Sequence, residues 1–108
     1  MFIAFASKNQ LCLNSELGDN IFKSEYITVV ELEDGKLKKV TNVENLFFNQ
    51  VVEPVAFAEL IKTTKAEFLV VTKVENAAIM NELIKQHVAV KEGSSGRIAA
   101  LLENFQKF

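Results

Sequence analysis

The fold is decided by residues 54–108, which read PVAFAELIKTTKAEFLVVTKVENAAIMNELIKQHVAVKEGSSGRIAALLENFQKF. Apolar side chains recur at helical spacing in residues 54–65, 76–86 and 95–106, so these three segments are predicted to be helices. Residues 67–72 and 88–91 are short apolar segments between them and indicate buried strands. The alternation of strand and helix predicts parallel strands joined by helical crossovers.

The first half of the chain is predicted to form strands joined by turns. Residues 2–6 are continuously apolar, which is typical of a strand covered on both faces. Residues 25–33 and 36–43 flank Asp34-Gly35, a pair that favours a type I′ hairpin because glycine tolerates a positive φ. We therefore expect a single α/β domain over residues 1–108, with a mixed sheet and helices packed on it.

The composition is that of an ordinary globular protein, with 49% hydrophobic and 24% charged residues. The net charge of -2 and the single arginine argue against nucleic acid or an anionic membrane as a partner. No apolar segment approaches the ~20 residues of a membrane-spanning helix, and the N-terminus lacks the basic flank of a secretory signal. The single cysteine, Cys12, cannot form an internal disulfide. We expect a complete cytoplasmic domain.

Three residues are candidate metal ligands, namely Cys12, Glu16 and His87. Cys12 and His87 are conventional soft-metal ligands, and Glu16 lies in a turn where it could ligate a hard cation. Zinc and cluster sites usually show paired spacings such as C-x-x-C, which this chain lacks. In the alternative interpretation Cys12 packs as a small hydrophobe, His87 has a surface or capping role, and Glu16 is solvated.

Two further groups of residues are candidate binding sites. Ser94, Ser95 and Arg97 lie at the start of the predicted helix 95–106, where backbone N–H groups, hydroxyls and a guanidinium could hold a phosphate or carboxylate. Their alternative role is helix capping by serine beside an exposed arginine.

The other group is Leu46, Phe47 and Phe48, in a segment without clear periodicity. These side chains are either an exposed contact for a protein partner or part of the core. No nucleophile stands beside a base in the sequence, so no catalytic residue is predicted and we expect the protein not to be an enzyme.

Five stretches follow one pattern along the chain: residues 2–6, 13–18, 29–36, 68–71 leading to Asn76-Ala77, and 88–90 followed by the helix from Ser95. This pattern resembles the dinitrogenase iron–molybdenum cofactor biosynthesis family. The resemblance implies a ribonuclease H-like fold. It also implies a non-enzymatic accessory or carrier protein of metallocluster assembly, with an iron–sulfur or iron–molybdenum type cluster and a protein partner.

The chain departs from that family at three places. Glu16 and Leu17 replace the family's His and Phe, residues 72–75 lack its glycine-rich turn, and residues 45–53 contain neither Gly nor His. Two hypotheses follow from these departures. The chain is either a divergent carrier with other ligands, or a metal-free protein–protein interaction module on the same scaffold.

Overall fold

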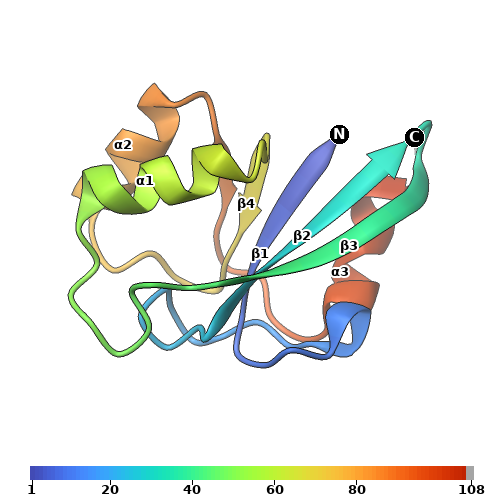
Figure 1. Cartoon of the computed structure of the whole chain (residues 1–108), viewed down its shortest axis with the longest axis horizontal. Coiled ribbons are helices and arrows are strands. Elements are labelled where there is room, and N and C mark those ends of the chain that lie inside the picture. Colours follow the sequence, from blue (N-terminus) through green and yellow to red (C-terminus); the bar gives the residue numbers. More distant parts are fainter. Residues whose placement is uncertain (107–108) are drawn as a thin grey trace.

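The computed structural model describes residues 1–106, which form one five-stranded mixed sheet and three α-helices (Figure 1). The α/β class with helices packed on a mixed sheet is thereby confirmed. No helix among these residues is both long and apolar enough to cross a membrane. The elements are β1 (Phe2–Ser7), the 3-10 helix η1 (Cys12–Asn14), β2 (Tyr26–Glu33), β3 (Lys36–Glu44), α1 (Pro54–Thr63), β4 (Phe68–Val70), α2 (Ala77–Lys85), β5 (Ala89–Lys91) and α3 (Ile98–Gln106).

The sheet has the strand order β3-β2-β1-β4-β5. β2 runs antiparallel to β1 and β3, whereas β4 runs parallel to both β1 and β5. The predicted parallel half of the sheet is confirmed, although β4 and β5 have only three residues each. The narrower ribonuclease H-like assignment stays a prediction.

The β2–β3 hairpin turns at Asp34 and Gly35, with φ angles of 54° and 75°. Both angles are positive, as a type I′ turn requires. The hairpin therefore turns at the predicted position, where Gly35 adopts a positive φ that glycine tolerates without strain.

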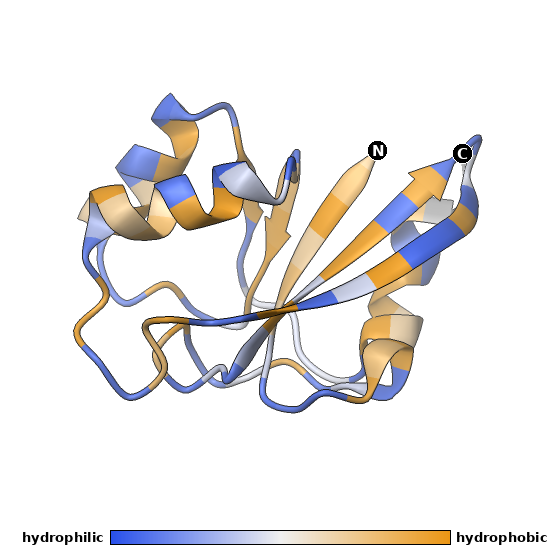
Figure 2. Ribbon diagram, in the orientation of Figure 1, coloured by the Kyte–Doolittle hydropathy of each residue, from blue (hydrophilic) through white to orange (hydrophobic). Residues whose placement is uncertain are grey.

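Helices cover both faces of the sheet. α1 and α2 pack on one face and α3 on the other (Figure 1). Because β1 lies in the middle, Ile3 and Phe5 face the core with α3, whereas Ala4 and Ala6 face the core with α1 and α2. Figure 2 accordingly shows β1 as apolar along its length, while β3 at the sheet edge alternates between apolar and polar residues.

The starts of the helices depend on side-chain caps. Glu53 accepts hydrogen bonds from the N–H groups of Val55 and Ala56, and Pro54 occupies the first turn of α1. Asn76 accepts a hydrogen bond from the N–H of Ile79 at 3.1 Å and is therefore the N-cap of α2.

The predicted start of the last helix at residue 95 is wrong, because α3 begins at Ile98. Residue Arg97 instead pairs with Glu16 in an isolated antiparallel bridge. The N–H of Ile98 donates to the carbonyl of Ser15 at 2.9 Å. A contact with a distant loop therefore keeps Arg97 out of the helix, and Gly96 before it has a positive φ of 97°, outside the helical region. Local propensity did not reveal this contact.

The connections at one edge of the sheet come together. The register pairs Ser7 with Tyr26, Tyr26 with Glu44, and Val70 with Lys91, so the ends of β1, β3, β4 and β5 meet the start of β2. Loops 8–25, 45–53, 71–76 and 92–97 consequently lie along this edge, at the bottom of Figure 1. We call it the carboxyl edge, and it is where open α/β sheets usually bind ligands.

Candidate functional site

Three loops of the carboxyl edge line an open apolar groove of about 410 Å³, which is the candidate functional site. This volume falls within the range of roughly 300–1,000 Å³ that is typical of small-ligand pockets. We call it the Glu75 groove. It is lined by Phe22, Asn49, Gln50, Val51, Val52, Glu75 and Asn76.

The loops around this groove are held in place by hydrogen bonds between residues far apart in the chain. The buried side chain of Asn45 donates through Nδ2 to the carbonyls of Ile21 and Ser24, at 2.9 and 2.7 Å. The N–H of Asn49 donates to the carbonyl of Phe22 at 2.7 Å. Segment 45–52 therefore supports segment 21–24, and together they present Phe22 to the groove.

Glu75 is the charged residue that lines the groove. Its Oε1 accepts a hydrogen bond from the N–H of Ile21 at 2.7 Å. Its Oε2 is buried and forms no hydrogen bond with the described residues. Burial raises the pKa of Glu75 above its ordinary value, and backbone N–H groups offset only part of this effect. The site thus contains an incompletely satisfied carboxylate beside apolar walls, and such an arrangement often marks a functional site.

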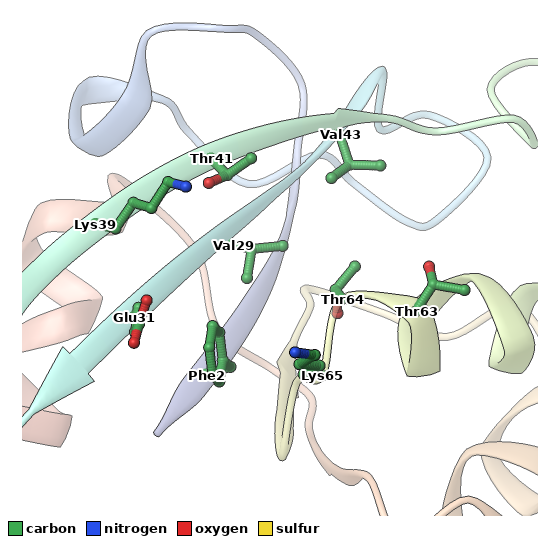
Figure 3. A pocket seen from close by; sticks show the side chains of 9 residues that line it. All are labelled: Phe2, Val29, Glu31, Lys39, Thr41, Val43, Thr63, Thr64 and Lys65. Atoms are coloured by element: carbon green, nitrogen blue, oxygen red, sulfur yellow. The ribbon is translucent and has the colours of Figure 1, made fainter.

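A second groove, of about 390 Å³, lies on the face of the sheet that α1 and α2 leave open beside β2 and β3 (Figure 3). Its floor is formed by strand side chains, and one wall by the end of α1. Its charges are mixed, because Lys39 and Lys65 line it together with Glu31. We call it the sheet-face groove, and its residues are Phe2, Val29, Glu31, Lys39, Thr41, Val43, Thr63, Thr64 and Lys65.

The structure does not bring Cys12, Glu16 and His87 together. Cys12 is exposed in η1 rather than packed in the core, and its Sγ accepts a hydrogen bond of 3.6 Å from Asn42. His87 lies in the connection from α2 to β5, and this connection is at the edge opposite the carboxyl edge (Figure 1). Among residues 1–106, no group of three or more His, Cys, Asp or Glu side chains is placed to hold a metal ion.

Glu16 has cationic neighbours. Its carboxylate pairs with the Lys8 ammonium at 2.9 Å. This hydrogen bond and the charge of Lys8 lower the pKa of Glu16, and the charge of Arg97 lowers it further. Glu16 and Arg97, predicted for different sites, are therefore neighbours whose charges offset one another.

The predicted anion-binding residues lie just before α3 rather than in its first turn. Ser94 is buried, whereas Ser95 and Arg97 are exposed. Since the carbonyl of Ser15 already accepts from Ile98, the first N–H of α3 is not free for an anion.

The predicted interface residues divide between core and surface. Leu46 is 65% exposed, whereas Phe47 and Phe48 are half-buried. Phe47 packs against the core, with its ring centroid 5.9 Å from that of Phe57. Val51, which is 91% exposed, was not predicted and is the more prominent apolar residue of this loop.

Glu75, Phe22 and Asn45 were also not predicted. A signal for Glu75 was present in the sequence, because it lies between a buried strand and a helix cap. A residue in that position lies at the carboxyl end of a parallel strand. Phe22 and Asn45 give no comparable signal, since contacts between distant loops place them.

No family model and no curated protein matches the sequence. Among solved structures, PH0822 has a TM-score of 0.85 and 20% identity, covering 98% of this chain and 90% of its own. A proposed NifB protein from Thermotoga, of the DUF35 family, has a TM-score of 0.77 and 21% identity. The match covers 98% of this chain and 87% of that protein. A proposed dinitrogenase from Methanocaldococcus jannaschii has a TM-score of 0.61 and 10% identity. The match covers 97% of this chain and 90% of that protein. The chain thus shares its whole fold with proteins that include two whose names are linked to nitrogenase.

Proposed function

We propose that this protein is a non-enzymatic accessory or carrier protein of metallocluster assembly, of the iron–sulfur or iron–molybdenum type. The observation that carries the proposal is the likeness over 98% of the chain to a proposed NifB protein. The resemblance of the sequence to the dinitrogenase iron–molybdenum cofactor biosynthesis family supports it. The ribonuclease H-like fold that this family implies is part of the proposal.

The donor atoms of the chain do not fit a resident cluster. Iron–sulfur clusters are usually held by about four cysteine thiolates, and the sequence contains only Cys12. Lys8 and Arg97 already offset the charge of Glu16, and His87 lies at the opposite edge of the sheet. In this proposal the cluster is cargo, held by exposed Cys12 together with ligands from a protein client or a small thiol.

Anaerobic reconstitution tests the carrier form of this proposal. The protein is incubated with ferrous iron, sulfide and a small thiol, separated by gel filtration, and examined by visible absorbance and metal analysis. We expect the wild type to retain iron, Cys12→Ser to lose it, and His87→Gln to retain it as a matched control. If the wild type retains no iron, or Cys12→Ser retains as much, the carrier form is wrong.

The second candidate function is a metal-free protein–protein interaction module in the cytoplasm. Exposed Leu46 and Val51, which lie in one loop of the carboxyl edge, favour it. Its test is a Leu46→Ser, Val51→Ser double variant, compared with wild type by sedimentation velocity and by chemical cross-linking to a client. Loss of association at an unchanged melting temperature supports the module, and unchanged association contradicts it.

A further inference from the structure

We infer that the Glu75 groove binds the side chain of a lysine or arginine presented by a protein partner. This inference does not depend on cluster binding, because the groove contains none of the residues assigned to that role. It names the chemistry of a partner for this groove, which shares only Val51 with the interaction module proposed above.

The charge of Glu75 selects a cation. In the described part of the chain, no lysine or arginine forms an ion pair with this carboxylate. Its Oε2 is buried and forms no hydrogen bond with the described residues, so the carboxylate is less well solvated than one at the surface. A negative charge that is poorly solvated and not neutralised attracts a cation more strongly than one in open water.

The walls of the groove suit the long aliphatic stem of such a side chain. Val51 and Val52 provide apolar surface, and Phe22 provides an aromatic ring. Lysine and arginine characteristically bury their methylene groups on apolar surface while the charged end finds a polar partner. The exposed amides of Asn49 and Gln50 line the same groove and can hydrogen bond to the backbone of a partner.

A cation already lies beside this aromatic ring. The Nζ atom of Lys23 is 5.3 Å from the centroid of the Phe22 ring. This distance is within the range of cation–π attraction. The ring of Phe22 can thus accommodate a cation, and it lines the same groove as the Glu75 carboxylate. The sheet-face groove provides no such selection, since Lys39 and Lys65 line it together with Glu31.

The test compares two small probes by amide chemical shifts, in a titration monitored by NMR. Nα-acetyl-lysine amide carries the cation, and Nα-acetyl-norleucine amide has a similar stem without the charge. The titration is run in mildly alkaline buffer, because burial raises the pKa of Glu75 and a higher pH favours its charged form. We expect the lysine probe to shift the resonances of residues 21–22, 49–52 and 75–76, and the norleucine probe to shift them far less. Equal shifts from both probes, or none from the lysine probe, would overturn the inference.

Matched variants test whether the charge of Glu75 is the one that binds the lysine probe. Glu75→Gln retains an acceptor for the N–H of Ile21 but removes the charge, and we expect about tenfold weaker binding of the lysine probe. Glu59→Gln makes the same charge change on the exposed side of α1, outside the groove, and is expected to bind like wild type. Cys12→Ser is expected to bind like wild type even if reconstitution fails. Undiminished binding by Glu75→Gln would overturn the inference.

Discussion

Phe47 lies edge-on against Phe57, with the ring centroids 5.9 Å apart and the ring planes at 78°. Because Phe47 is half-buried, Phe47→Ala is expected to lower the free energy of unfolding by about 1–3 kcal/mol, less than a fully buried phenylalanine would cost. Urea denaturation measures this change. Leu46→Ala, at an exposed position, is the control and should change stability by no more than about 0.5 kcal/mol. Equal losses in the two variants would contradict the assignment of Phe47 to the core.

Asn45 joins the loops that shape the Glu75 groove. Its buried Nδ2 donates to the carbonyls of Ile21 and Ser24, and its Oδ1 accepts from the N–H of Phe47. Asn45→Ala leaves these buried groups without partners and is expected to cost about 1–3 kcal/mol of unfolding free energy. Asn45→Asp should cost more, because a carboxylate oxygen would face the two carbonyls. An Asp variant as stable as wild type would show that these hydrogen bonds are not formed in solution.

The sequence predicts most of the sheet and its helices because their signals are local. Pro54 and Asn76 mark helix starts, and Asp34-Gly35 marks the hairpin. The start of α3 is an exception, because the bridge between Glu16 and Arg97 decides it. Such a contact joins residues far apart in the chain, and no periodicity or propensity encodes it.

The candidate site is less predictable than the fold for the same reason. Asn45, Phe22 and Glu75 come from three separate loops, and only the strand order brings these loops to one edge. For Cys12 and His87 the opposite holds, because two residues with suitable metal-binding chemistry lie in connections at different edges of the sheet. Residue type alone therefore indicates a ligand, whereas the topology decides whether ligands meet.

Burial of Glu75 links stability to pH. Its pKa in the folded protein is raised, so the folded state binds its proton more tightly than the unfolded chain does. The contribution of Glu75 to the free energy of unfolding is therefore most favourable below the ordinary glutamate pKa. This contribution is lost as the pH rises through the raised pKa of the folded protein. We expect Glu75→Gln to lack this pH dependence and to be more stable than wild type at neutral pH, in denaturation experiments across a pH series. If the free energy of unfolding of the wild type instead increased relative to that of Glu75→Gln as the pH rises, the expected direction of the pH dependence would be contradicted.

The ion pair of Lys8 and Glu16 is expected to change a pKa without greatly changing stability. Lys8 lowers the pKa of Glu16 through a hydrogen bond and its charge, so Lys8→Gln should raise that pKa toward its ordinary value. Arg97→Gln should raise it by less, since Arg97 contributes only through its charge. NMR titration of the Glu16 side-chain carboxyl measures both shifts. A larger shift in Arg97→Gln than in Lys8→Gln would reverse the assignment of the main partner.

The proposal that this protein handles metalloclusters is tested most directly by its metal content after isolation. The protein is purified without exposure to oxygen from cells that assemble iron–sulfur or iron–molybdenum clusters. Iron, molybdenum and acid-labile sulfide are then measured for wild type and for Cys12→Ser. The proposal predicts iron and sulfide bound to the wild type and strongly reduced in the variant. Wild-type protein without iron, molybdenum or sulfide, both alone and in complex with a client, would contradict it.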